Sequence, residues 1–307
     1  MVSQLVDFSS GAPIEVNVKV EWMDGSKLSE PRVQVHALDE HTFVLRQSLK
    51  TNFEGPFVFL LLGNTGAILI DSGATEDAEI WPVRVTVDQI VANWLAKHPN
   101  PSYQLTVAHS HGHDDHKAGD SQFAGRPNTT IVPTHLEGVQ EQFGFVNWPE
   151  EVVPFDLGGR IISVIAGPGH EAAAVIYYDP WTGVLFTGDT LYPGRLYVED
   201  MPAFIASLGR TIAFMSGVKV THLLGCHIEM SSTPGQDYPL GSRSHPGEVP
   251  LPMHSNQLAQ LLARAVDIAA TPGIYPYDDV IIYNGAAVVD AYLRPTIASP
   301  TIASPTI

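Results

Sequence analysis

The stretch from residue 107 to residue 120 reads V-A-H-S-H-G-H-D-D-H-K-A-G-D, with four histidines and two aspartates between His109 and His116. It follows the apolar run Gln104–Ala108, which predicts a buried strand. So many polar side chains cannot all be buried unpaired, because each would lose its hydration. Imidazole and carboxylate together suit Zn²⁺, Fe²⁺ or Mn²⁺. The stretch therefore predicts a metal site at a strand end, with an exposed polar loop as the alternative.

Four shorter motifs accompany this stretch along the chain. Upstream, the sequence I-D-S-G occupies residues 70–73, and downstream come G-P-G-H at 167–170, F-T-G-D at 186–189 and G-C-H at 225–227. Together with the order H-x-H-x-D-H at residues 111–116, this succession resembles the metallo-β-lactamase superfamily. The resemblance covers roughly residues 33–230, which is most of the chain.

The resemblance implies an α/β fold, the αβ/βα sandwich, with the metal ions at the edge where strands end. It also implies two groups of ligands with one shared residue. The first ion would be held by His111, His113 and His170, the second by Asp115, His116 and His227, and both by Asp189. We expect two divalent ions, with zinc favoured and iron or manganese as alternatives.

Two adjacent ions can share a hydroxide whose pKa lies near neutrality, and that hydroxide can attack a carbonyl carbon. Asp115 is assigned a catalytic as well as a ligand role. We expect a hydrolase of carboxylic esters, lactones or thioesters, in the glyoxalase II-like and lactonase-like group. Asp189 argues against a dedicated β-lactamase, because those enzymes carry Cys or Ser there. The alternatives are a β-lactam, phosphoester or sulfate-ester hydrolase, or an iron-dependent oxidoreductase of the same fold.

Other residues are candidates for supporting roles. Asp71 is expected to stabilise the loop beneath the metal site, and His109 to lie beside it without binding metal. The phenol of Tyr192 is a candidate to reach a substrate oxygen, with simple packing as the alternative. The loop after the last ligand, residues 238–254, holds three candidates for substrate contact: Arg243, His245 and His254.

Composition limits the partners. The chain has 307 residues, with 33 acidic and 16 basic side chains and a formal net charge of −17. That balance argues against nucleic acid, whose phosphates need clustered Lys and Arg. A single cysteine, Cys226, excludes an internal disulfide. Residues 1–11 lack the pattern of a signal peptide, and no apolar run could cross a bilayer. We expect a small-molecule substrate, no membrane partner and a cytoplasmic location, with secretion and a homodimer left open.

The pattern of apolar residues predicts many short elements. Strands are expected at residues 16–22, 33–36, 42–45, 56–62, 67–70, 104–108, 130–132, 161–165, 174–178, 184–187 and 220–224. Helices are expected at 83–97, 201–215 and 255–270. Asn284-Gly285 predicts a hairpin joining 280–283 to 287–289. We expect one domain over residues 1–294 and a disordered tail over 295–307, where the unit PTIAS repeats.

Overall fold

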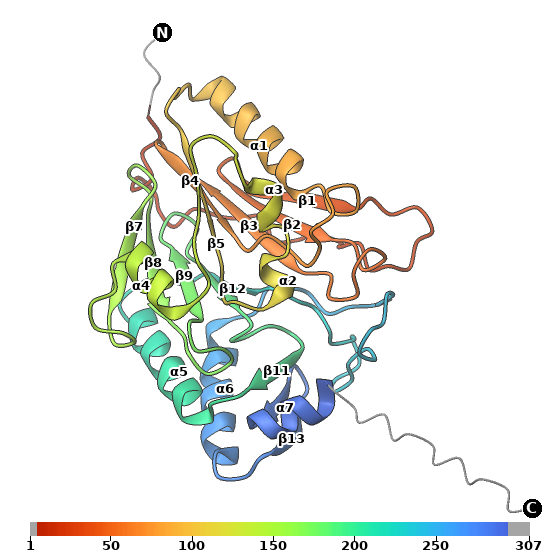
Figure 1. Ribbon diagram of the computed structural model, residues 1–307. Helices are drawn as coiled ribbons and strands as arrows, with labels where there is room; N and C mark the ends of the chain where they lie inside the picture. Colours follow the sequence, from red (N-terminus) through yellow and green to blue (C-terminus); the bar gives the residue numbers. More distant parts are fainter. Residues whose placement is uncertain (1–4, 294–307) are drawn as a thin grey trace, which may run out of the picture.

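The computed structural model describes residues 5–293, and two β-sheets form its centre (Figure 1). The first sheet has six strands in chain order: β1 (Val33–Asp39), β2 (Thr42–Gln47), β3 (Phe57–Leu62), β4 (Gly66–Ile70), β5 (Gln104–Ala108) and β6 (Thr129–Ile131). The second has the order β12 (His222–Gly225), β10 (Val184–Gly188), β9 (Val175–Asp179), β8 (Ile161–Ala166) and β7 (Val152–Asp156).

Strand β3 shows why the first sheet is buried on both faces. Successive side chains of a strand point to opposite faces. Phe57 and Phe59 join the core between the two sheets, which also contains Phe186 of β10. Val58 and Leu60 join a separate core on the outer face of the first sheet. All six residues of β3 are buried, so the strand reads as a continuous apolar run.

Helices cover the outer face of each sheet. On the first sheet lie α1 (Val83–Lys97) and the short α3 (Asp120–Phe123), and on the second lie α5 (Met201–Met215) and α6 (Ser255–Ile268) (Figure 1). Two further helices, α2 (Asp114–Lys117) and α4 (Leu136–Phe143), follow β5 and β6. The layer order of helix, sheet, sheet and helix is the predicted αβ/βα sandwich.

A small third sheet corrects the hairpin expected near the C-terminus. It has the order β11 (Arg195–Val198), β14 (Ile281–Asn284) and β13 (Gly273–Pro276). After β14 the chain turns through Gly285, whose φ of 104 favours glycine, and enters helix α7 (Ala286–Leu293). The second strand expected at 287–289 is therefore wrong, because β14 pairs with β13 and β11 instead.

The strand expected at residues 16–22 is also wrong. Val16, Val18 and Trp22 pack against the core between the sheets, which explains their apolar alternation. The segment is extended but has no strand assignment, and Asn17 donates a backbone hydrogen bond to Leu38 without starting a ladder. Among the described residues no helix is long and apolar enough to cross a membrane. The expected tail at 295–307 lies outside the described residues.

Candidate metal centre

The segments that carry the predicted ligands all begin where a strand ends. His111 and His113 follow β5 in the first sheet, whereas His170, Asp189 and His227 follow β8, β10 and β12 in the second. Strands β10 and β12 are parallel, as are β4 and β5, so the loops after β10 and β12 leave the second sheet at the same edge. Five side chains from four segments that are far apart in sequence therefore meet at one place.

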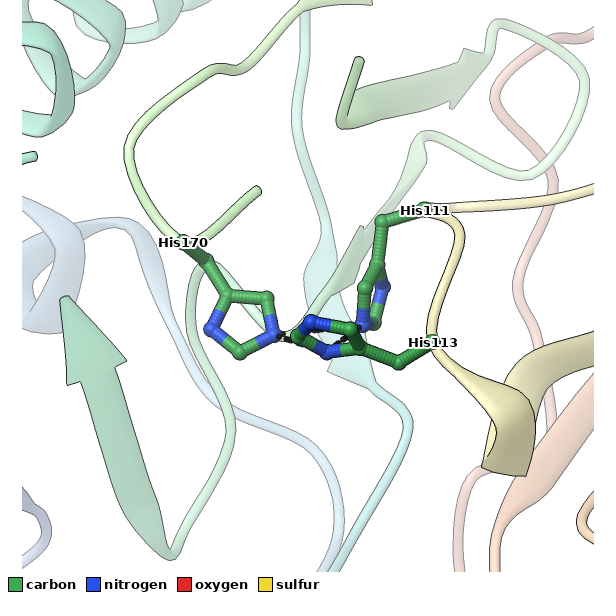
Figure 2. A group of neighbouring side chains, drawn as sticks. All are labelled: His111, His113 and His170. Atoms are coloured by element: carbon green, nitrogen blue, oxygen red, sulfur yellow. Dashed lines mark hydrogen bonds between the residues drawn. The ribbon is translucent and has the colours of Figure 1, made fainter. Parts of the chain in front are cut away.

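The first group consists of three imidazole rings that face one another. Figure 2 shows His111 and His113 on one segment and His170 on another, with their rings turned inward. His111 Nε2 lies 3.0 Å from His113 Nδ1, and His170 Nε2 lies 3.1 Å from each of those two atoms. Tetrahedral zinc with nitrogen ligands at about 2.0–2.1 Å separates them by about 3.3 Å. The triangle therefore fits one ion with small adjustments.

The second group consists of two histidines and two aspartates. His116 Nε2 and His227 Nε2 each lie 3.3 Å from Asp115 Oδ2, and 3.4 Å from each other. Asp189 lies 3.5 Å from His116 Nε2 through Oδ2 and 3.6 Å from His227 Nε2 through Oδ1. These separations match the edges of a tetrahedron around a zinc-sized ion, about 3.3 Å.

Asp189 lies between the two groups. Its Oδ2 is 3.7 Å from His170 Nε2 and 4.0 Å from His111 Nε2. Its Oδ1 is buried and has no hydrogen-bond partner among the described residues. A buried carboxylate oxygen without a partner is costly unless a cation or donor binds it. The position of Asp189 thus suits a carboxylate shared by two ions.

Hydrogen bonds on the far side of the rings fix which nitrogen faces the centre. His170 Nδ1 lies 2.6 Å from the carbonyl oxygen of Tyr197, and His227 Nδ1 lies 3.0 Å from that of Glu54. A carbonyl only accepts, so each Nδ1 carries a proton and Nε2 is the nitrogen that faces the centre. In the first group the rings of His111 and His170 are neutral, and nitrogen lone pairs that face one another at about 3 Å repel. A cation between them removes that repulsion, so the donor set fits a metal ion.

The pKa values of the histidines differ between the two groups. Burial and the neighbouring His116 hold the pKa of His111 well below its usual value. Burial also lowers the pKa of His116, but Asp115, Asp189 and Asp71 outweigh it and raise that pKa well above the usual value. For His227 the same opposition, with Asp189 and Asp115 outweighing burial, raises the pKa to about 10. Negative charge is concentrated in the second group, as a cation site requires.

The structure places Asp71 beneath the second group and His109 outside both. Asp71 Oδ2 accepts a hydrogen bond from His116 Nδ1 at 2.9 Å, and Oδ1 accepts one from the Ser110 backbone at 2.7 Å. His109 instead contacts Asp120 Oδ1 through Nε2 at 2.9 Å. It belongs to neither of the groups that converge on one point.

A pocket of about 330 Å³ opens above the two groups. Its floor includes His113, Asp115, His170, Asp189 and His227. The walls include Asp114 from the histidine-rich stretch, and the other wall residues come from segments outside the quoted motifs: Glu54, Tyr192, Tyr197, Glu199, Glu229, Val289, Asp290 and Leu293. Burial and the nearby Asp115 raise the pKa of Glu54 to about 7. Of these wall residues, only Tyr192 is among the candidates for substrate contact in the sequence, because only the folded chain brings the others together.

The candidates for substrate contact have other positions. Tyr192 lines the pocket, but its hydroxyl donates to the carbonyl of Arg195 and is fully buried. Arg243 donates to the carbonyl oxygen of Lys50 at 2.8 Å on the surface.

The two histidines of the same loop are also engaged elsewhere. His245 stacks on Tyr238 and contacts Glu248 at 3.2 Å, and the backbone N–H of His254 donates to Gln257 at the start of α6. Arg243, His245 and His254 do not line the pocket. The structure therefore brings none of these three to the metal centre.

Comparison with curated proteins finds distant relatives. A hydroxyacylglutathione hydrolase of Rhizobium meliloti is 29% identical over 161 residues, which are 49% of this chain and 57% of that protein. Another from Nostoc punctiforme is 29% identical over 165 residues, 50% of this chain and 58% of that protein. The chain thus spans little more than half the length of these curated relatives.

Comparison with solved structures finds the same fold. The metallo-beta-lactamase FIM-1 from Pseudomonas aeruginosa has a TM-score of 0.52 and 13% identity, covering 79% of this chain and 98% of that one. A metallo-beta-lactamase from Erythrobacter litoralis has a TM-score of 0.50 and 17% identity, covering 78% and 99%. The family model of the metallo-beta-lactamase superfamily matches residues 51–271. That span includes every residue of the two ligand groups, and the chain belongs to the metallo-beta-lactamase superfamily.

Proposed function

We propose that this chain is a dinuclear-metal hydrolase that opens a carboxylic ester, a lactone or a thioester. The observation that carries the proposal is the pair of ligand groups that share Asp189 and form the floor of one pocket. Relatives named hydroxyacylglutathione hydrolase, at 29% identity, support a thioester among the three bonds.

The ligand atoms indicate which metals fit. Both groups offer only imidazole nitrogens and carboxylate oxygens, which suit Zn²⁺ and, as alternatives, Fe²⁺ or Mn²⁺. Two divalent ions bound there would lower the pKa of a water molecule and polarise a carbonyl oxygen. Separations of 3.3 to 3.6 Å in the second group and of 3.0 to 3.1 Å in the first are compatible with zinc.

The residues of the chain prepare the site in two ways. Backbone carbonyls and Asp71 hold the ligand rings in one tautomer, so little reorganisation is needed when metal and substrate bind. The ligands His111, His116, His170 and His227 are buried, which leaves the pocket as the side from which a carbonyl group can approach. Both features are what a preorganised hydrolytic site needs.

The proposal is tested on purified protein by elemental analysis and an acid-release assay. The panel holds an acyl-homoserine lactone, an aryl ester, a glutathione thioester, a β-lactam, an organophosphate and a sulfate ester, each with and without chelator. We expect about two metal ions per chain and chelator-sensitive hydrolysis of at least one carbonyl substrate.

Two alanine variants sharpen this test. His113→Ala should lose bound metal and lower turnover by orders of magnitude, because one corner of the first group is gone. His135→Ala is the matched control, since His135 is exposed and belongs to neither group. Full activity of His113→Ala, or a fully metallated protein that hydrolyses no carbonyl substrate, would overturn the proposal.

A further inference from the structure

We propose that the pocket above the metal centre selects substrates that carry a positive charge, such as a substituted ammonium group, beside the scissile carbonyl. This inference rests on the proposed function. Apart from the metal ligands, every charged side chain that lines the pocket is a carboxylate: Glu54, Asp114, Glu199, Glu229 and Asp290. Between residues 5 and 293, no lysine or arginine lines it.

Most of these carboxylates have no cation beside them. Glu199 and Asp290 are exposed, and neither forms an ion pair within the described part of the chain. Glu54 also has no ion pair among those residues, but its pKa of about 7 leaves it only partly charged at neutral pH, so it contributes less than the other two. Asp114 has only a long contact of 3.5 Å with Lys117, and its side chain is 97% exposed. A long, exposed pair of this kind is largely screened by water. The walls of the pocket therefore keep an excess of negative charge.

The one guanidinium near the pocket does not cancel this charge. Arg195 contacts Glu229 Oε1 at 2.5 Å, but it also contacts Asp237 Oδ2 at 2.6 Å. The three groups together keep one negative charge. Arg195 is itself buried, so it cannot reach an anionic substrate in the pocket.

The carboxylates reach the pocket from three segments that are far apart in sequence. Glu54 lies in the loop before β3, Glu199 directly after β11 and Asp290 on α7. Figure 1 shows β11 and α7 next to each other, below α2 in this view. Tyr197 of β11 also lines the pocket and adds an aromatic ring. Carboxylates and an aromatic ring are the surroundings that recognise substituted ammonium ions.

The floor of the pocket is suited to the metal ions, and its unpartnered carboxylate oxygen belongs to them rather than to a substrate. Asp189 Oδ1 is buried without a partner and lines the pocket, as an oxygen that awaits a cation would. The positive charge of metal ions at the floor would be offset in part by two of their own ligands, Asp115 and Asp189. Glu199 and Asp290 lie on the walls instead, where the substituents of a substrate must lie, so they act on specificity.

The same charge disfavours a glutathione thioester. The glutathione part carries two carboxylates and one ammonium, so its net charge is negative at neutral pH. Like charges repel, and no basic side chain among the described residues of this pocket opposes that repulsion. We therefore expect poor activity on the substrate that the names of the curated relatives suggest.

The test uses two thioesters of the same shape and acyl group, acetylthiocholine and 3,3-dimethylbutyl thioacetate. They differ by a quaternary nitrogen in place of a carbon, and thiol release is followed with a chromogenic disulfide. On the metal-loaded protein at low salt, kcat/KM should be at least about tenfold higher for the cationic thioester. The ratio should fall as salt is added.

Variants connect the preference to named residues. Glu199→Gln and Asp290→Asn should each lower the ratio of cationic to neutral kcat/KM about two- to fivefold, mainly through KM. Glu137→Gln is the matched control, because Glu137 is exposed on α4 and does not line the pocket. A ratio near one in the native protein, or a ratio that neither pocket variant changes, would overturn the inference.

A binding measurement separates this inference from the proposed function. Choline and 3,3-dimethylbutan-1-ol are compared by calorimetry on the metal-loaded protein, with no turnover involved. Choline should bind at least about tenfold more tightly. Preferred binding of choline without hydrolysis of any ester, lactone or thioester would leave the inference standing and refute the hydrolase. Chelator-sensitive hydrolysis of the neutral thioester with equal binding of both probes would do the reverse.

Discussion

Replacing Asp71 by asparagine should weaken the second metal group without moving the backbone. Asp71 has a φ of 66, and asparagine tolerates this left-handed conformation better than most residues. The Oδ1 atom that accepts from the Ser110 backbone at 2.7 Å is kept. The Oδ2 atom becomes an NH₂ group, although it now accepts from His116 Nδ1 at 2.9 Å, Ser110 Oγ at 3.0 Å and Cys226 Sγ at 3.1 Å.

The consequence for His116 can be followed atom by atom. Two donors cannot face each other, so His116 Nδ1 must become an acceptor and its proton must move to Nε2. That Nε2 lies 3.3 Å from Asp115 Oδ2 and 3.5 Å from Asp189 Oδ2, and it needs a free lone pair to bind a metal ion there. Loss of an orienting partner of this kind costs about 10- to 100-fold in metal affinity, or about 1.4 to 2.7 kcal/mol.

The assay is competition for zinc with a chromogenic chelator, together with the metal content of the purified variant. The matched control is Asp120→Asn, the same change in a carboxylate that contacts His109 Nε2 at 2.9 Å. Because His109 belongs to neither ligand group, the control should keep both ions. If Asp71→Asn binds two ions as tightly as the native chain, the hydrogen bond to His116 does not set its tautomer and the reasoning fails.

Three further predictions concern stability. Arg160→Met should lower the free energy of unfolding by about 3–5 kcal/mol in urea titrations, because it leaves the fully buried Asp179 without its ion pair; a loss below about 1 kcal/mol would contradict this. Gly169→Ala should lower the free energy of unfolding by about 2 kcal/mol or more, since Gly169 has a φ of +144 and the new Cβ would lie 2.5 Å from the Phe204 backbone. Because Gly169 directly precedes His170, the variant should also bind less metal, and a native metal content would contradict this prediction. Chelation should lower Tm, and added zinc should restore it, because bound metal at about 100 times Kd contributes about 2.7 kcal/mol; a calorimetric Tm that chelator leaves unchanged would refute metal binding.

The layers of the fold could be predicted because the sequence of most strands is itself typical of a buried strand. β3 and β4 are short apolar runs bounded by turn residues, and α6 has a clear apolar stripe. The errors have local causes as well. Val288 and Val289 favour a strand by propensity, yet after Gly285 they lie in α7. There Val289 packs against Ile281 and Tyr283 of β14. Residues 16–22 alternate like a strand but lack a partner strand.

The candidate metal ligands could be picked out in the sequence for a different reason from the fold. Four of them occupy residues 111–116, and such density of imidazole and carboxylate has few structural uses. The walls of the pocket could not be predicted, because Glu54, Tyr197 and Asp290 are more than 90 positions apart and no short motif connects them. Their meeting depends on how β11, β14 and α7 pack, which is a property of the whole fold.

Two residues link the metal ligands to the walls of the pocket. The backbone carbonyls of Tyr197 and Glu54 accept from His170 and His227, whereas the side chains of the same residues line the pocket. The orientation of the two histidine rings therefore depends on backbone carbonyl groups, which are present whatever the side chain at that position. A substitution of Glu54 or Tyr197 can change the charge and shape of the pocket while the carbonyl still holds its histidine. The shape of the pocket and the orientation of the two rings are thus set by different atoms of the same two residues.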